Sequence, residues 1–291
     1  MRFGAHLPTA AFGGRLAGRD VLIEYAEIAE ALGFSTLCAN DHLLFSVPWM
    51  DALVALGLAA GRTSRVRLMT TAALLAVRGA APLASALAAL QHLSGGRLEA
   101  AVTPGSSQAD YEAVGADFGS RWGLFDAEVP RLRAYLQEAL PYGPPPIWIA
   151  SWGSEAGLKR VARLGDGWLA SAYHGTPQHI EESLAYLHAR LAASGKDPAG
   201  FPVALATTYL FLSEDPIALR SAVELVVSPA AAPSDLRDRL LIGTLEECVD
   251  RLRQLEAAGI REVFVWPLRD ELLQLRLFAE EVIPRVNVVS R

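Results

Sequence analysis

The sequence predicts an α/β fold, and specifically a closed (β/α)8 barrel. Three observations support this: short apolar runs alternate with longer helical patterns along the whole chain, there are eight of each, and most of the runs are continuously apolar. A strand buried on both faces, as in a parallel barrel, has this continuous pattern. The eight predicted strands are 2–7, 34–39, 65–72, 97–103, 147–150, 167–170, 203–212 and 262–266.

The helical patterns lie between these runs. The clearest covers 244–258, where apolar residues recur at helical spacing with charged residues between them. Thr244 and Glu247 form a capping-box pattern at its start, and Gly259 follows its end. The predicted helices lie near 20–32, 50–61, 82–93, 125–139, 155–164, 177–194, 244–258 and 269–283.

The main alternative is an open, doubly wound sheet. That fold normally begins with a G-x-G-x-x-G turn, and the first turn here has glycines without that spacing. A length of 291 residues suits one barrel, so we predict a single domain over 1–291. We also predict two loop insertions, at about 104–124 after the fourth strand and at about 213–243 before the last helix–strand unit. Irregular segments of that length are usually functional.

Composition excludes several classes of function. The net charge is −6, and no Lys/Arg-rich run is present to bind nucleic acid. The most apolar region, 72–90, is interrupted by Arg78 and Pro82, so we expect no membrane span, and the first residues do not form a secretion signal. Cys38 and Cys248 lie far apart and fit no metal-binding spacing. We therefore expect a soluble, cytoplasmic protein.

Polar residues follow most of the predicted strands, and in a barrel these residues share the face that carries the active site. Their types exclude some chemistry, because we find no carboxylate and histidine cluster for a metal, no paired carboxylates for glycoside hydrolysis and no G-x-S-x-G turn. Asp41 and His42 form the one adjacent acid–imidazole pair on this face. The candidates are His6, Asn40, Asp41, His42, Thr103, Gly105, Ser106, Ser107, Ser151, Gly153, Ser154, Ser171 and His174.

Each of these candidates also has a structural interpretation. The turn Ser151–Ser154 precedes a helix, so it suits a phosphate, but Ser154 is equally an ordinary N-cap. A histidine such as His42 can be satisfied by a neighbouring acid or by backbone. Trp49 and Trp122 can stack on a substrate or can pack under a long loop.

The chain also resembles the bacterial-luciferase-like flavin and deazaflavin oxidoreductases from end to end. The resemblance rests on MRFGAHLP, on AEALGFSTLCANDHL with its Asp-His pair, on LSGGRLEAAVTPGSSQADYEAVGADF, and most specifically on PPIWIASWGSEAGLKRVARLGDGW. These segments follow the order seen in the family. The resemblance implies a (β/α)8 barrel that holds FMN or coenzyme F420 at its C-terminal face.

The resemblance also implies roles for individual residues. Ala72–Ala73 would occupy a bulge in the third strand, often a non-prolyl cis peptide, that backs the cofactor ring. Relatives that oxidise sugar phosphates carry an acid where this chain has Ser106 and a lysine where it has His174, so the sugar-phosphate reaction is not expected. The implied cofactor residues are Ala72, Ala73, Thr103, Gly105, Ser106, Ser107, Ser151, Gly153, Ser154, Ser171 and His174.

We expect a two-electron oxidoreductase that acts on a small organic molecule, by hydride transfer through F420 or by oxygenation on FMN. A composition rich in arginine and poor in lysine slightly favours F420. His42 would exchange a proton with the substrate, oriented by Asp41, while His6, Trp49 and Trp122 would contact the substrate and 104–124 would form a lid. The alternatives are an inactive ligand-binding barrel of the same ancestry and an unrelated lyase or isomerase that uses His42. We also expect a possible homodimer.

Overall fold

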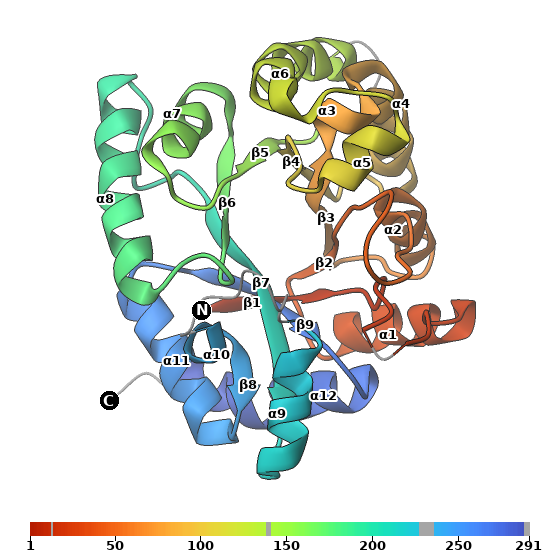
Figure 1. Ribbon diagram of the computed structural model, residues 1–291, viewed down its shortest axis with the longest axis vertical. Helices are drawn as coiled ribbons and strands as arrows, with labels where there is room; N and C mark the ends of the chain where they lie inside the picture. The colour runs from red at the N-terminus through yellow and green to blue at the C-terminus, as the bar shows by residue number, and fades with distance from the viewer. Residues whose placement is uncertain (13, 138–140, 227–235, 288–291) are drawn as a thin grey trace.

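Eight parallel strands close into a barrel, as predicted (Figure 1). The computed structural model describes residues 1–12, 14–137, 141–226 and 236–287. Each strand pairs with the next around the ring, and the ring closes because β9 pairs with both β1 and β7. The barrel strands are β1 (Arg2–His6), β2 (Thr36–Ala39), β3 (Arg67–Leu74), β4 (Leu98–Thr103), β5 (Ile147–Ala150), β6 (Gly167–Ser171), β7 (Val203–Leu212) and β9 (Glu262–Pro267).

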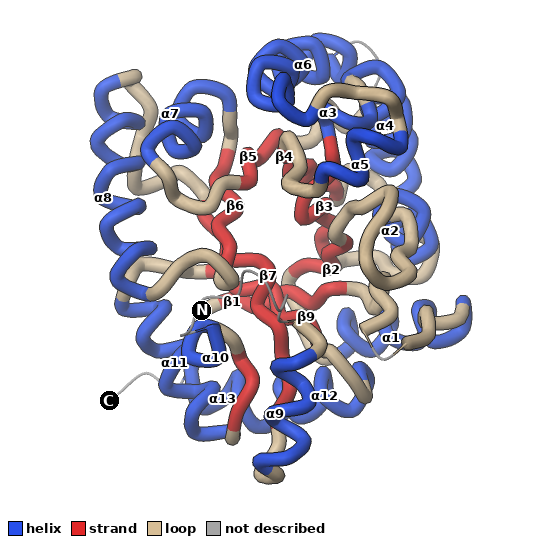
Figure 2. Tube along the Cα trace, viewed as in Figure 1, coloured by secondary structure: helices blue, strands red, loops and turns tan. Residues whose placement is uncertain are grey.

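Helices surround the strands on the outside, as Figure 2 shows. The predicted capping box is confirmed, since Thr244 and Glu247 each accept a backbone N–H at the start of α11. No helix in the described ranges combines the length and apolarity that a bilayer span needs. The helices are α1 (Arg19–Ala31), α2 (Ala52–Ala60), α3 (Leu75–Arg78), α4 (Ala80–Leu93), α5 (Gln108–Ala113), η1 (Phe118–Ser120), α6 (Arg121–Gln137), α7 (Glu155–Leu164), α8 (Pro177–Ala193), α9 (Pro216–Glu224), α10 (Leu236–Arg239), α11 (Leu245–Ala257), α12 (Glu271–Leu277), η2 (Phe278–Val282) and α13 (Ile283–Asn287).

The two predicted insertions contain secondary structure that was not predicted. Segment 104–124 holds α5, η1 and the start of α6. Segment 213–243 holds α9, α10 and a ninth strand, β8 (Leu241–Gly243), which pairs with the end of β7; residues 227–235 lie outside the described part of the chain. At three residues, β8 is too short to show a periodic pattern in the sequence.

Strand β7 is bulged in its middle. Its register against β9 shifts between Leu205 and Thr208, and Thr207 within this shift has a left-handed backbone (φ 55°). This conformation is unusual for a β-branched residue. Before the bulge β7 pairs with β6, and after it β7 stays paired with β9 while its last residues also pair with β8.

Successive strand residues point to opposite sides of the barrel wall and so build two cores. Leu37, Leu68 and Val263 belong to the outer core between strands and helices. The inner core fills the barrel and contains Cys38, Met69, Ala72, Ala101, Trp148, Leu169, Ala204, Ala206 and Phe264. Side chains on the inward register beyond this layer reach the C-terminal end of the barrel, which we call the mouth.

The N-terminal end of the barrel interior is filled by charged side chains. Glu262 is buried and is paired with Arg67 and with Arg2, the latter at 3.0 Å, while Ser35 donates a hydrogen bond to it at 2.7 Å. Arg67 also contacts Glu99 at 2.5 Å. Buried charges persist only when they are paired in this way. Ion pairs therefore fill the N-terminal end of the barrel, which leaves the mouth as the end where a ligand can bind.

Candidate functional site

His42 follows β2 at the mouth, and Asp110 of α5 holds its imidazole. His42 Nδ1 lies 2.8 Å from Asp110 Oδ2, and Asp110 Oδ1 accepts the backbone N–H groups of Leu43 and Leu44, both at 2.8 Å. Burial alone would raise the pKa of Asp110, but the contact with His42 and the two backbone donors outweigh it and lower that pKa. Because a carboxylate only accepts hydrogen bonds, the proton of neutral His42 lies on Nδ1 and Nε2 is left as a proton acceptor.

The prediction that Asp41 orients His42 is wrong. Asp41 forms a two-point contact with Arg78, at 2.7 Å from Nε to Oδ2 and 2.6 Å from Nη2 to Oδ1, and also accepts the N–H of Leu74. The same Arg78 guanidinium reaches Asp51 at 2.6 Å. Asp41 and His42 are adjacent in sequence, but each has a partner from a different element, Arg78 at the end of α3 and Asp110 of α5.

Aromatic rings connect His42 with the ends of the neighbouring strands β1 and β9. Its imidazole lies 4.5 Å from the ring of Phe45 and 4.9 Å from that of Trp49. Trp49 contacts Trp266 at 5.7 Å, and Trp266 stacks on His6 at 4.3 Å. The structure thus brings together His6, His42 and Trp49, which were predicted for the site. It adds Trp266, which was not predicted. We call His6, His42, Phe45, Trp49 and Trp266 the aromatic cluster.

His6 is the innermost member of the aromatic cluster and is almost fully buried. Burial lowers its pKa to about 3, so its imidazole is neutral near pH 7. Thr71 Oγ1 lies 3.4 Å from its Nε2. His6 therefore contributes a neutral, polar ring at the base of the cluster.

Strand β3 is bulged at the mouth, where its register against β4 shifts between Thr70 and Ala73. A non-prolyl cis peptide lies here, but it joins Thr71 to Ala72, one bond before the predicted Ala72–Ala73. Asn40 Nδ2 donates to the carbonyl oxygen of Thr71 at 2.5 Å. Only one residue of the predicted pair faces inward: Ala72 belongs to the inner core, whereas Ala73 is buried in the outer core, away from the mouth.

The Gly-Ser turn follows β5 and leads into α7. Gly153 has φ +91°, and a Cβ placed there would lie 2.4 Å from His179 Nε2, so the turn needs glycine at this position. Ser151 Oγ accepts the N–H of Gly153 at 3.3 Å, and Ser154 Oγ accepts that of Gly157 at 3.2 Å. Ser154 is therefore the N-cap of α7.

The start of α7 remains able to receive an anion. The first intrahelical hydrogen bond runs from Leu158 N to Ser154 O, so the amides of Glu155 and Ala156 precede the helical ladder. These N–H groups and the helix dipole favour a phosphate. The N-cap and the anion site are compatible, because they use different N–H groups.

A second cluster lies where β6 ends, beside the bulge in the middle of β7. Ser171 Oγ is 3.1 Å from His174 Nδ1 and 2.7 Å from Thr207 Oγ1. The ring of His174 stacks on Trp152 at 3.7 Å. Burial, with a smaller contribution from Arg239, lowers the pKa of His174 to about 4. The predicted pair Ser171 and His174 is thus in contact, and Trp152 and Thr207 join it through tertiary contacts that the sequence does not reveal.

The remaining predicted residues, those after β4 and Trp122, do not belong to either of these two clusters. Thr103 Oγ1 accepts the N–H of Gly105 at 3.2 Å, Ser106 is exposed and Ser107 is half-buried at the start of α5. Trp122, predicted to contact substrate, lies at the start of α6, 41% exposed. Its ring packs under the guanidinium of Arg160 at 4.6 Å, on the outer helices and not in the aromatic cluster.

The two sides of the mouth differ in their side chains. On the side of β3 to β7 the inner wall carries Ala72, Ala101, Ala150 and Ala206 beside the larger Met69, Trp148 and Leu169, whereas the aromatic cluster occupies the side of β1, β2 and β9. Small residues next to aromatic ones fit a planar ring system, and the start of α7 fits a phosphate attached to it. In the described residues no three His, Cys, Asp or Glu side chains gather as metal ligands would.

Comparison with known proteins identifies the family and the fold. The sequence profile of the luciferase-like monooxygenases matches residues 1–262. An F420-dependent glucose-6-phosphate dehydrogenase from Beutenbergia cavernae is 26% identical over 327 residues, which cover 95% of this chain and 96% of that protein.

Two solved structures have a similar fold. The monooxygenase RslO1 from Streptomyces bottropensis superposes with a TM-score of 0.83 at 23% identity, covering 98% of this chain and 99% of that one. The oxygenating constituent of 3,6-diketocamphane monooxygenase from Pseudomonas putida, in complex with FMN, gives 0.74 at 16% identity and covers all of both chains.

The burial of His6 predicts a specific loss of stability in acid. The folded pKa is about 3 and the unfolded pKa about 6.5, so between these values the unfolded chain binds a proton that the folded chain does not. Stability therefore falls as pH decreases below 6.5, by about 1.4 kcal/mol per pH unit, or about 2 kcal/mol at pH 5. Urea unfolding at pH 7 and pH 5 should show this loss in the wild type and a smaller loss in His6→Phe, which keeps a ring against Trp266. Equal losses in the two proteins would contradict the prediction.

Proposed function

The chain belongs to the luciferase-like monooxygenase family, and on this basis we propose that it is an F420- or FMN-dependent oxidoreductase that acts on a small organic substrate. The observation that supports the proposal most directly is the layout of the mouth. The imidazole of His42, the bulge of β3 with Ala72 and the start of α7 all lie at the C-terminal ends of the strands. This is the end at which barrel enzymes of this type carry their active sites.

We propose that the cofactor lies along the β3–β7 side of the mouth. Its ring would lie against Ala72, and its phosphate would bind the amides at the start of α7. When bound, it would supply the two-electron chemistry, either hydride transfer or oxygen activation. The chain residues proposed to contact it are Ala72, Thr103, Gly105, Ser106, Ser107, Ser151, Gly153, Ser154, Ser171 and His174.

In this proposal His42 exchanges a proton with the substrate through Nε2, because Nδ1 is held by Asp110. The aromatic cluster would exclude water from the reacting groups and provide an apolar surface for the substrate. Segment 104–124, which carries Asp110, would act as the lid. We do not propose a sugar phosphate as the substrate, since Ser106 and His174 stand where such relatives have an acid and a lysine.

The proposal predicts tight binding of a phosphorylated flavin or deazaflavin. Titration of the purified protein, followed by fluorescence, should show binding of FMN or of F420. It should also show binding at least about tenfold weaker for the matching compound without phosphate, riboflavin or its deazaflavin analogue, because the start of α7 loses its anion. Binding of neither phosphorylated cofactor would refute the proposed function. Equal affinity with and without phosphate would refute the role of α7.

The proposal also predicts that His42→Ala separates binding from catalysis. Cofactor affinity should change little, because the ring and phosphate contacts proposed above do not involve His42. Turnover of the bound cofactor, followed by absorbance with a panel of small alcohols, ketones and aldehydes, should fall by about 100-fold as the proton acceptor is lost. Tyr135→Ala is the control and should retain turnover, since Tyr135 is exposed on the outer helix α6, outside the mouth and the proposed lid. Unchanged turnover in His42→Ala would exclude the assigned role.

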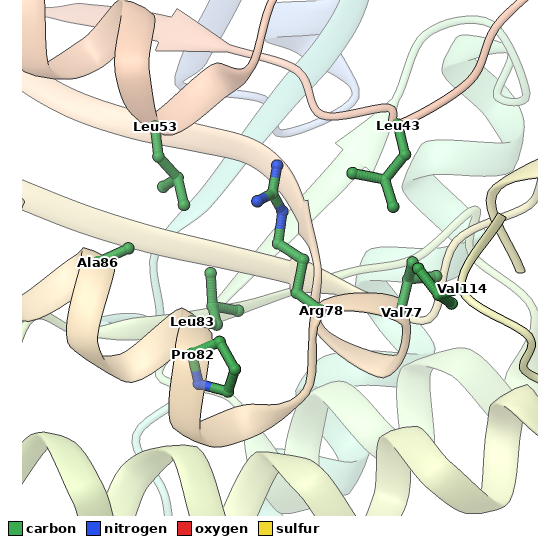
Figure 3. Close-up of a pocket in the computed structure, with 8 residues that line it drawn as sticks. All are labelled: Leu43, Leu53, Val77, Arg78, Pro82, Leu83, Ala86 and Val114. Carbon is green, nitrogen blue, oxygen red and sulfur yellow. The ribbon is translucent and has the colours of Figure 1, made fainter.

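We further propose that the protein forms a homodimer through the outer face of α2. This helix, ALVALGLAA, is apolar on every side, yet Val54 is 69% exposed. Leu53 borders a cavity of about 290 Å³ that Pro82 and Leu83 of α4 also line (Figure 3). A helix that is apolar all round is normally covered.

Light scattering after size-exclusion chromatography tests this proposal. We expect a mass twice the 31.2 kDa of one chain. Val54→Glu should give the monomer, because a two-fold interface would bring two new carboxylates together. A wild-type monomer at micromolar concentration would refute the dimer.

A further inference from the structure

Asp110 shares its two carboxylate oxygens between different kinds of donor. Oδ1 receives the amides of Leu43 and Leu44, and Oδ2 receives His42 Nδ1, all at 2.8 Å. A carboxylate oxygen has about two good acceptor positions, so the two amides occupy Oδ1 fully. The Asp110 carboxylate is therefore held in one orientation, with Oδ2 facing the imidazole of His42.

From this arrangement we propose that Asp110 is the positioning residue of the site: it fixes His42 as the Nδ1–H tautomer and so keeps Nε2 free to accept a proton. The role of this tautomer in catalysis rests on the proposed function. The presence of the tautomer is independent of that proposal. A neutral imidazole has two tautomers of similar energy, and the partner of one nitrogen decides which tautomer is present. Asp41 cannot compete for the ring, because Arg78 and the N–H of Leu74 hold both of its oxygens.

Apolar packing and hydrogen bonds act together around this contact. Leu43, next to His42, packs in one small hydrophobic cluster with Tyr111 of α5. Leu43 and Val114, just after α5, also line the cavity of about 290 Å³ (Figure 3). Asp110 is itself buried, and a buried carboxylate without its donors would be costly. The apolar contacts join α5 to the segment after β2, and the three hydrogen bonds of Asp110 set the orientation of the His42 imidazole.

A purely structural role is the competing explanation: Asp110 would tie α5 to residues 43–44, and His42 would be incidental. Asp110→Asn separates the two. Its single amide oxygen can still accept both backbone N–H groups, which turns its NH₂ group toward His42 Nδ1. That nitrogen must then accept a hydrogen bond, so His42 changes to the Nε2–H tautomer, as occurs when the acid of a catalytic triad is replaced by its amide.

The experiment is ¹⁵N NMR of the histidine side chains in uniformly labelled protein without cofactor, at a pH where the imidazoles are neutral. The His42 signals are assigned by their loss in His42→Gln. We expect Nδ1–H in the wild type and Nε2–H in Asp110→Asn. Hydrogen exchange of the Leu43 and Leu44 amides should remain slow in both proteins.

Asp117→Asn is the matched control. Asp117 lies in the same segment and accepts the N–H of Gly119 at 3.0 Å, away from His42. The tautomer of His42 should not change in this variant. After the cofactor titration, turnover of the cofactor-loaded Asp110→Asn protein should be about 100-fold lower at unchanged cofactor affinity.

The outcomes are distinct. An Nε2–H tautomer in the wild type overturns the proposal without any variant, so the test stands even if Asp110→Asn fails to fold. An unchanged tautomer in Asp110→Asn also overturns it, and if Leu43 and Leu44 exchange faster as well, Asp110 is a structural tie. A switched tautomer in a protein that binds neither FMN nor F420 would support the positioning role and refute the proposed function.

Discussion

Closure of the barrel is the constraint on which the rest of the structure depends. Because β9 pairs with both β1 and β7, the ring has no free edge and all eight strands end at one mouth. The same closure fixes the register of every strand, and the register decides which side chains face inward. His6 and Ala72 reach the interior on this register, while Ala73 is directed into the outer core. A chain without closure would place the same residues on separate edges.

The sequence was informative about the elements because each leaves a local signal. Continuous apolar runs predicted all eight barrel strands, and the Thr244–Glu247 pattern predicted the cap of α11. The exceptions lie in the two segments predicted as loops: β8 has three residues, α5 has six and α9 has nine. The sequences of β8 and α5 are too short to carry a clear periodicity, whereas α9 begins with an N-cap, Asp215, that was overlooked.

The sequence predicted many of the residues that form the site, but it did not predict which of them contact one another. Adjacency suggested that Asp41 serves His42, but the partner of each lies far along the chain: Arg78, 37 residues away, and Asp110, 68 residues away. Asp110 was not among the predicted site residues, although it lies in the segment predicted as an insertion after the fourth strand. Trp266 and Thr207 were missed for a similar reason, because ring stacking and a left-handed bulge depend on neighbouring strands.

The two segments that interrupt the barrel serve different halves of the mouth. Segment 104–124 sends Asp110 to His42, whereas segment 213–243 brings Arg239 to the Tyr173 carbonyl, beside His174. Past the bulge at Thr207, β7 pairs with both β9 and β8 and leads into the second segment, which holds α10. Loops vary more readily than the strands that carry them. The fold therefore lets evolution alter the two halves of the mouth separately, through changes in two loops that share no strand.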